Sequence, residues 1–224
     1  IAFGCPGWLE GVIQANYFIR SGDAKRCMVI GTETLSRVTD AYDRDTLLYS
    51  DGSGAIILDA STNGDKGIIA HKTETHAYEH AMLLSMAPSF NPDSAENDLY
   101  LKMNGRKLYE FALSNVPLLI RNLLDKSGTD LGEIRKVLIH QANEKMDAAI
   151  VERLFKLYNR HAVPAGIMPM IISWLGNNSV ATIPILLDLI QKNRVEDHKI
   201  CAGDKIVLAS VGAGMNINAL LYQF

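Results

Sequence analysis

The chain has 224 residues, 48% of them apolar, and its 25 acidic and 22 basic side chains give a formal net charge of -3. This composition predicts a soluble globular protein with one large core or two smaller domains. No basic block indicates a nucleic-acid partner, and no apolar run approaches the roughly 20 residues of a membrane-spanning helix.

The cysteines Cys5, Cys27 and Cys201 lie far apart in the sequence. Three thiols cannot all form disulfides, and no Cys-x-x-Cys spacing indicates zinc. We therefore expect a cytoplasmic protein without a metal site. The first residues, Ile-Ala-Phe-Gly, contain neither an initiator methionine nor a signal peptide. They are typical of a strand end, which predicts that the protein continues upstream.

The N-terminal part of the sequence predicts a helix between strands. Apolar spacing over residues 6–21 is typical of a mostly buried helix, and residues 26–31 are typical of a buried strand. Residues 40–50 are polar and turn-prone, and residues 55–58 form an apolar strand. Residues 76–104 show no period, so we expect an irregular excursion there.

The C-terminal part alternates helical stripes with apolar strands. Apolar residues from Leu108 to Leu123 predict a long helix that Pro117 kinks. The elements expected after it are a strand over residues 137–139, a helix over 146–157, an extended segment over 167–174, a helix over 180–190, and strands over 205–211 and 216–224. Alternating strands and helices predict a layered α/β fold.

Cys5 lies in the segment Phe3–Trp8 (FGCPGW), between a strand end and a helix start. The two glycines allow a tight turn and close approach of a substrate, as in the nucleophile elbow of hydrolases. Free N–H groups and the dipole of the helix N-terminus favour a thiolate there. Although most cysteines are buried structural residues, this setting predicts a nucleophile. Cys27 and Cys201 lack the setting, and we expect both to be structural.

His140 ends a predicted strand in the motif His-Gln-Ala-Asn, where Asn143 is suited to cap the next helix. Asn177 lies in a Gly-Asn-Asn-Ser turn, and a Gly-Ala-Gly turn occupies residues 212–214. Taken singly, each has an ordinary structural interpretation, as a core histidine or a turn residue.

Together with the Cys5 elbow, these motifs resemble the thiolase superfamily in order and spacing, and in particular its beta-ketoacyl carrier-protein synthase III branch. Ser36-Arg37, Asp43-Arg44 and Asp51–Ala55 resemble that branch too, so the resemblance covers essentially the whole chain. It implies a thiolase-like α-β-α-β-α fold built of two similar halves, here missing much of the N-terminal half. Residues 1–103 would be the remainder of that half, and residues 104–224 the C-terminal half.

The resemblance also implies an acyltransferase of fatty acid or related polyketide biosynthesis. Cys5 would accept an acyl group from acyl-CoA, with the backbone N–H groups of Cys5 and Ala213 holding the oxyanion. His140 and Asn177 would stabilise the enolate formed when malonyl-acyl carrier protein loses carbon dioxide. The implied protein is a homodimer that needs no cofactor beyond its coenzyme A thioester substrates.

Three basic residues are candidates for substrate binding. Arg44 matches a family position that contacts the nucleotide end of coenzyme A, and Lys145 and Arg153 share one predicted helix that could meet an acidic carrier protein. A solvated helix face is the alternative, since Glu144 and Glu152 partly cancel the charge.

The sequence departs from the family at Pro6, Leu175 and Val211, which leaves the acyl primer open. A hydroxymethylglutaryl-CoA synthase and a type III polyketide synthase remain alternatives. A degradative thiolase is disfavoured, because residues 211–214 contain no second catalytic cysteine. A non-catalytic partner subunit is the alternative of another class. The activity of the 224-residue piece by itself is also open.

Overall fold

The computed structural model describes residues 1–61, 66–94 and 98–224. The helices are α1 (Gly7–Ser21), α2 (Ala77–His80), α3 (Gly105–Ser127), α4 (Glu144–Leu157), α5 (Ile172–Leu175) and α6 (Thr182–Gln191). The strands are β1 (Arg26–Glu33), β2 (Gly52–Asp59), β3 (Gly67–Thr75), β4 (Leu84–Pro88), β5 (Leu99–Met103), β6 (Ile134–Ile139), β7 (Lys205–Gly212) and β8 (Asn216–Gln223). Short 3-10 turns used below are η2 (Arg44–Leu48), η5 (Ser179–Ala181) and η6 (Ala213–Met215).

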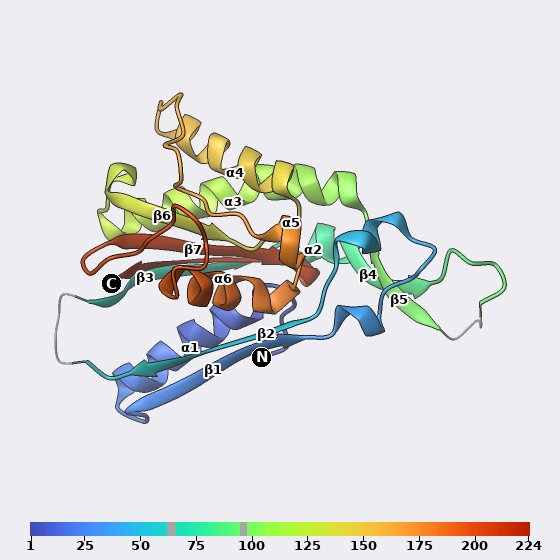
Figure 1. Cartoon of the computed structure of the whole chain (residues 1–224), viewed down its shortest axis with the longest axis horizontal. Helices are drawn as coiled ribbons and strands as arrows, with labels where there is room; N and C mark the ends of the chain where they lie inside the picture. Colours follow the sequence, from blue (N-terminus) through green and yellow to red (C-terminus); the bar gives the residue numbers. More distant parts are fainter. Residues whose placement is uncertain (62–65, 95–97) are drawn as a thin grey trace.

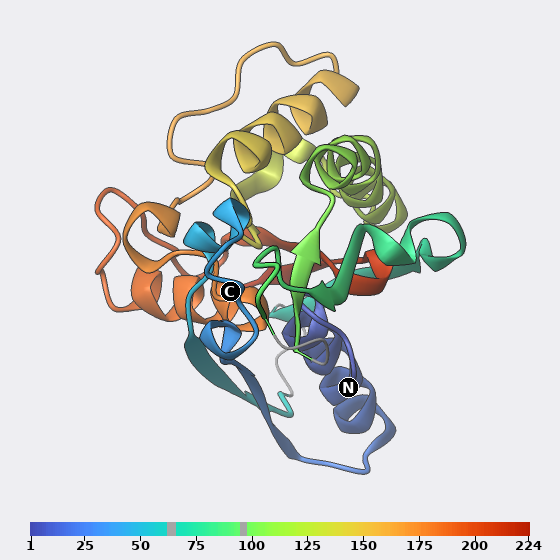
Figure 2. The same ribbon diagram turned by 90° about the vertical axis from the view of Figure 1, so that its right-hand side faces the viewer.

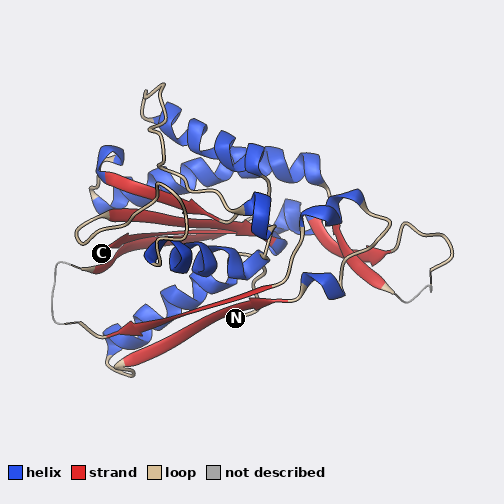
Figure 3. Cartoon of the chain, in the orientation of Figure 1, coloured by secondary structure: helices blue, strands red, loops and turns tan. Residues whose placement is uncertain are grey.

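Helices and sheets form successive layers (Figure 1, Figure 3). The helices α3 and α4 cover one face of a four-stranded sheet of order β3-β8-β7-β6, while α1 and α6 cover its other face. The two-stranded sheet β1-β2 lies beyond α1 and α6. The layered α/β fold predicted from the sequence is confirmed, and the described residues supply four of its five layers. The strand β3, which precedes residue 104, belongs to the same sheet as β6, β7 and β8.

The four-stranded sheet forms the centre of the core, because helices exclude water from both of its faces. One apolar cluster joins α3 and α4 to the sheet, and a second joins α1 and α6 to its opposite face. β7 and β8 are therefore buried along most of their length instead of at alternate residues. None of the helices among the described residues combines the length and apolarity needed to cross a bilayer.

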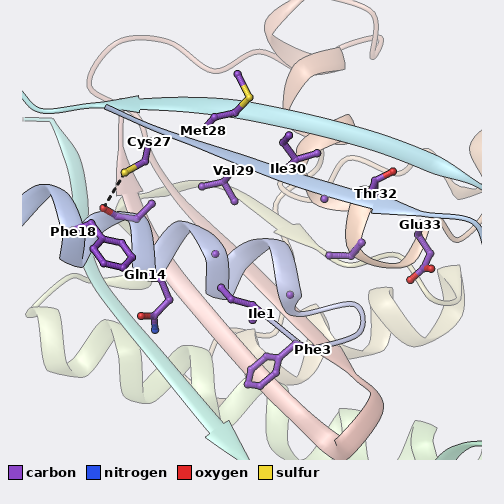
Figure 4. Close-up of a pocket in the computed structure, with 15 residues that line it drawn as sticks. Ile1, Phe3, Gln14, Phe18, Cys27, Met28, Val29, Ile30, Thr32 and Glu33 are labelled. Carbon is purple, nitrogen blue, oxygen red and sulfur yellow. Dashed lines mark hydrogen bonds between the residues drawn. The ribbon is translucent and has the colours of Figure 1, made fainter. Parts of the chain in front are cut away.

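The strand expected over residues 26–31 is present, but the prediction that it is buried is wrong. Met28 and Ile30 on β1 are 62% and 58% exposed, and Ile57 on β2 is 56% exposed. In the described part of the chain only the α1 and α6 side of this sheet is covered, so alternate side chains face outward. A hollow beside β1, lined by Ile1, Phe3 and Phe18 among others, adds to this open apolar surface (Figure 4).

The expected irregular excursion over residues 76–104 is also a wrong prediction. It contains the short helix α2 and an antiparallel hairpin of β4 and β5, which projects at one end of the molecule (Figure 1). Figure 2 views the molecule from this end, with the hairpin beside the segment 35–50. Asp40 accepts hydrogen bonds from Lys102, Ser89 Oγ and the Phe90 N–H, which fastens the hairpin to that segment.

One smaller expectation in the C-terminal part differs from the structure. The long helix expected from Leu108 to Leu123 is present as α3, which continues through the buried Pro117. Residues 167–174 do not form an extended strand, and only α5 is regular there. Instead, the buried Gln141 side chain donates to the Pro169 carbonyl at 2.8 Å and accepts from the Ile171 N–H at 2.8 Å. These side-chain bonds replace those of a strand ladder. Asn143 caps α4 as predicted.

Candidate active site

The three residues that the motifs single out, Cys5, His140 and Asn177, line one small cavity. They come from the turn before α1, the end of β6 and the turn after α5. Because these segments lie far apart in the sequence, the cavity exists only when the layers are assembled. The other side chains that line it include Leu35, Tyr49, Leu84, Leu101, Met103 and Ser179.

The Cys5 elbow is a tight turn held against η6. The Gly7 N–H donates to the Gly4 carbonyl at 2.8 Å, which closes the turn at the start of α1. A Cβ placed on Gly212 would lie 2.6 Å from Pro6 Cδ and 3.0 Å from Cys5 Cβ, closer than real atoms approach. Glycine at 212 therefore lets the strand end pack directly on the Cys5 turn.

The Cys5 thiol is not the activated thiolate that the helix N-terminus predicts. Burial raises the pKa of Cys5 to about 11, against a lowering contribution from its 3.4 Å contact with Ser179 Oγ. Pro6 has no N–H and the Gly7 N–H is bonded to Gly4, so neither donates to the sulfur, and the lowering by the Cys5 backbone does not offset the burial. At neutral pH the resting group is a thiol.

His140 is buried at the end of β6, with 2% of its surface exposed. Its N–H donates to the Ala209 carbonyl at 2.9 Å, which fixes the backbone beside β7. Burial lowers the pKa of His140 to about 4, while the Asp147 carboxyl group and the Ser179 backbone act in the opposite direction. The imidazole is therefore neutral at pH 7.

The Asn177 backbone is held by two hydrogen bonds, one through its N–H group and one through its carbonyl. Its N–H donates to the Leu48 carbonyl at 2.7 Å, and its carbonyl accepts from the Ser50 N–H at 3.0 Å, so it pairs like a strand with the end of η2. Its side-chain Oδ1 accepts from the Ser179 N–H at 2.9 Å. Because the amide oxygen is occupied, the Nδ2 group is the one left to donate to a ligand.

The glycine-rich turn lies beside the elbow. A Cβ built on Gly4 would stand 3.5 Å from the Ala213 nitrogen, so the backbone of Ala213 borders the Cys5 turn. In this turn Gly214 and Met215 have positive φ, and Ala213 does not. The alanine side chain at 213 therefore causes no backbone strain.

The basic candidates do not line this cavity. Arg44 is exposed at the start of η2, and Lys145 and Arg153 are exposed on α4, where Arg153 donates to the Leu113 carbonyl at 3.2 Å. Cys201 is exposed and does not line the cavity either. Among the described residues, no group of three or more His, Cys, Asp or Glu side chains could hold a metal ion.

Sequence reasoning missed Ser179, Tyr49 and Asp147. Ser179 was visible only as the last residue of a turn motif, although its hydroxyl contacts Cys5. Tyr49 was hidden in a polar segment, although it lines the cavity. Asp147 interrupts an otherwise apolar helical stripe, and this was the available signal for a buried charge.

Two family profiles match the chain: 3-oxoacyl-[acyl-carrier-protein (ACP)] synthase III over residues 1–77, and the C-terminal part of the same synthase over residues 124–224. The beta-ketoacyl-[acyl-carrier-protein] synthase III of Prochlorococcus marinus (strain NATL2A) is 31% identical, over 98% of this chain and 64% of the relative. That of Porphyra umbilicalis is 30% identical, over 100% of this chain and 67% of the relative. The chain thus spans about two thirds of the length of these relatives.

Solved structures agree with this result. The chain is similar to the 3-oxoacyl-[acyl-carrier-protein] synthase III of Aquifex aeolicus VF5, with a TM-score of 0.82, 30% identity and coverage of 100% of this chain and 66% of that one. The synthase III of Pseudomonas aeruginosa PAO1 gives a TM-score of 0.85 over 100% of this chain and 66% of that one. At 23% identity, this second likeness shows a common fold.

Proposed function

The chain belongs to the 3-oxoacyl-[acyl-carrier-protein] synthase III family, and from this premise we propose that the whole protein condenses an acyl-CoA primer with malonyl-acyl carrier protein. The observation that carries the proposal is the single cavity that a thiol, a neutral imidazole and a free amide donor share. These are the groups that an acyl transfer followed by a decarboxylation requires.

In the first step the Cys5 sulfur attacks the acyl-CoA thioester. A new carbon–sulfur bond forms at Cys5, the bond to coenzyme A breaks, and the Cys5 proton leaves with the coenzyme A thiol. The backbone N–H groups of Cys5 and Ala213 are proposed to hold the oxyanion of the tetrahedral intermediate. The closeness of Ala213 to the elbow supports this assignment.

In the second step malonyl-carrier protein loses carbon dioxide, and the electrons of the broken carbon–carbon bond move onto the thioester as an enolate. The neutral His140 and the Asn177 Nδ2 group donate hydrogen bonds to the enolate oxygen. The carbanion then attacks acyl-Cys5, the carbon–sulfur bond breaks with its electrons on the Cys5 sulfur, and a beta-ketoacyl-carrier protein leaves. The resulting Cys5 thiolate takes up a proton from water and becomes a thiol again. The chain's residues perform these steps without a cofactor.

Binding roles for the outer residues belong to the same proposal. Arg44 is proposed for the nucleotide end of coenzyme A, and the exposed Lys145 and Arg153 on α4 are proposed for the acidic carrier protein. We also propose a cytoplasmic homodimer, with residues 1–103 in its N-terminal half and residues 104–224 in its C-terminal half. The alternative of a non-catalytic subunit is disfavoured, since the three reactive side chains are all retained on one cavity.

Two partial reactions of the full-length protein test the proposal. Intact mass after incubation with short acyl-CoA should show one acyl adduct, which Cys5→Ala abolishes and Cys201→Ala, a matched cysteine control, retains. Carbon dioxide release from malonyl-carrier protein should fall about 100-fold or more in His140→Ala and in Asn177→Ala, since one oxyanion donor is typically worth 10²–10³ in rate. An adduct that persists without Cys5, or unchanged release in both mutants, would defeat the proposal.

A further inference from the structure

One buried amide interrupts the apolar face that β8 turns toward α1. Asn218 has no exposed surface. Its chain neighbours Ile217 and Ala219 pack on the α3 and α4 side of the sheet, so Asn218, which points the opposite way, faces α1 and α6. Leu220, the next residue on that face, belongs to the apolar cluster there. A buried amide needs hydrogen-bond partners and an aliphatic side chain needs none, so the contact that Asn218 makes indicates why this position is polar.

The partner of Asn218 is the elbow that carries Cys5. The Asn218 Nδ2 group donates to the Pro6 carbonyl at 3.0 Å, a buried bond between residues 212 apart in the sequence. Because a carbonyl oxygen only accepts, the amide nitrogen must be the end that faces Pro6. At the other end, Oδ1 has no partner among the described residues, and the same holds for the hydroxyl of Ser210, directly opposite on β7. The donor end of the amide is therefore the one with a defined contact.

This bond completes the fixing of the peptide unit between Pro6 and Gly7. The N–H of that unit donates to the Gly4 carbonyl at 2.8 Å, and its carbonyl accepts from the Glu10 N–H at 3.0 Å as well as from Asn218. The proline ring restricts φ of Pro6, which is -72°, and leaves ψ, which is -6°, as the dihedral that can turn. Hydrogen bonds at both ends of the unit oppose that rotation.

Asn218 also ties the elbow to the sheet. Of the three bonds to this peptide unit, those with Gly4 and Glu10 lie within the elbow and the first turn of α1, so they would move with it. Helix ends are the parts of a helix that fray most readily. The bond from Asn218 comes instead from β8, which is paired with β3 on one side and β7 on the other. The elbow is thus held in place relative to the centre of the core.

We propose that Asn218 is a positioning residue for acylation, which holds the Pro6 carbonyl and so keeps the Cys5 sulfur and the Cys5 N–H aligned with the acyl thioester. This inference rests on the proposed function, since it concerns the first of its two steps. The attacking sulfur and one proposed oxyanion donor both belong to Cys5, so a turn of the elbow misplaces them together. Attack on a carbonyl is sensitive to small misplacements of this kind.

Two substitutions remove the donor in different ways. Asn218→Val suits a strand and fills most of the space of the amide, whereas Asn218→Ala leaves that space open. Ser210→Ala is the nearby control, because it removes a buried hydroxyl without a partner among the described residues and leaves the elbow contact in place. Asn115→Leu is the matched control for the chemistry. The Asn115 amide also donates to a backbone carbonyl, that of Phe111 at 2.8 Å, but on α3 across the sheet.

The rates of the two partial reactions of the full-length protein separate positioning from general support of the fold. Intact mass against time, at a series of short acyl-CoA concentrations, gives the maximal acylation rate and the half-saturating concentration. The maximal rate should fall about tenfold or more in both Asn218 variants, while the half-saturating concentration stays that of wild type. Carbon dioxide release from malonyl-carrier protein should be unchanged in both, because it uses His140 and Asn177. Ser210→Ala and Asn115→Leu should match wild type in all three quantities.

Normal acylation rates in Asn218→Val and Asn218→Ala would overturn the inference and leave the proposed function intact. Equal losses of acylation and of carbon dioxide release, including losses through failure to fold, would also overturn it, because Asn218 would then support the fold in general. Failure of the proposed function is a different result. It would be seen as a wild-type protein that takes no acyl group on Cys5 and releases no carbon dioxide.

Discussion

Ser179 contacts the Cys5 thiol from a strained backbone position. Its hydroxyl lies 3.4 Å from the Cys5 sulfur, and its own backbone has φ of +50°, a region that few non-glycine residues adopt. The Ser179 N–H donates to the Asn177 side chain, so the strained backbone of Ser179 also orients a second residue of the cavity. Strain of this kind is often found at functional sites.

Replacing Ser179 by alanine should therefore make Cys5 a weaker acid and a slower nucleophile. The Ser179 contact lowers the pKa of a thiol that burial has raised to about 11. Its loss, at about 1 kcal/mol for one hydrogen bond, should slow iodoacetamide alkylation at pH 8 about fivefold. The exposed Cys201 provides an internal reference in the same mass spectrum, and an unchanged ratio of the two rates would contradict the prediction.

The buried carboxyl group of Asp147 should make the free energy of unfolding depend on pH. Its folded pKa of about 8 lies above its ordinary value of 3.8, so between these values the folded state binds more protons than the unfolded state. The contribution of Asp147 to the free energy of unfolding is therefore largest below about pH 4 and is lost as the pH rises toward 8. Relative to wild type, Asp147→Leu should gain about 1.4 kcal/mol per pH unit across this window.

Urea unfolding of the full-length protein at several pH values measures this gain. The His140 contribution has the opposite slope, because its pKa is lowered, but it is present in both proteins and largely cancels. Asp188→Leu is the control, since that carboxylate is 53% exposed beside Lys192 on α6. A stability difference between Asp147→Leu and wild type that does not vary with pH would disprove the raised pKa.

Among the packed elements, the contact between the end of β7 and the Cys5 elbow is the least tolerant of added volume. Gly212→Ala would force a methyl group to 2.6 Å from Pro6 Cδ. We expect a loss of about 1–3 kcal/mol of stability, the usual cost of overpacking, together with a loss of Cys5 acylation. Gly105→Ala, where the added atom would lie at an ordinary 3.7 Å from its nearest neighbour, should fold normally.

The β4-β5 hairpin depends on the Lys102 ammonium group, which pairs with both Asp40 and Asp43 and is shielded by the surrounding residues. Burial alone would raise the pKa of Asp40, but hydrogen bonds from Lys102 and from the Phe90 and Tyr42 backbone hold it well below its usual range. Lys102→Met would leave this carboxylate without its cation. Amide hydrogen exchange should then quicken in β4 and β5, less so near pH 3, where Asp40 can take up a proton once its cation is gone.

Lys192→Met is the matched control for this experiment. Lys192 pairs with Asp188 at 2.8 Å, but both side chains are more than half exposed, so the pair is expected to contribute little. If the amide hydrogens of β4 and β5 exchanged at the same rate in Lys102→Met and in Lys192→Met, the ion pairing of Lys102 would not be what fastens these strands.

Elements with strong periodicity could be predicted from the sequence, and those fixed by contacts between distant residues could not. The helix before Gly22 and the strand before His140 were correct, because apolar spacing and capping residues are local signals. The hairpin in residues 76–104 was missed, since its partner Asp40 lies far away in the sequence. The cavity residues were found through motifs, but burial around Cys5 reversed the expected protonation of its thiol.

As a whole, the chain exposes an apolar sheet face. Met28 and Ile57 are directly opposite each other on β1 and β2, and both are more than half exposed. Apolar pairs on an open strand promote association. The 224-residue chain should therefore self-associate increasingly as its concentration is raised. The double substitution Met28→Lys and Ile57→Lys should reduce this self-association, as measured by analytical ultracentrifugation. Tyr78→Lys, a substitution of an exposed residue outside that sheet, should not.

The pairing of Asn177 with the end of η2 has a mechanical consequence. The segment that holds the Asn177 backbone is the one that Asp40 and Asp43 tie to Lys102 of the hairpin. The hairpin, that segment and the Asn177 amide group are therefore connected through these contacts. A displacement of the hairpin that widened the cavity would therefore also move Asn177 away from Cys5 and His140. Under the proposed mechanism, decarboxylation then requires the rim of the cavity to be closed.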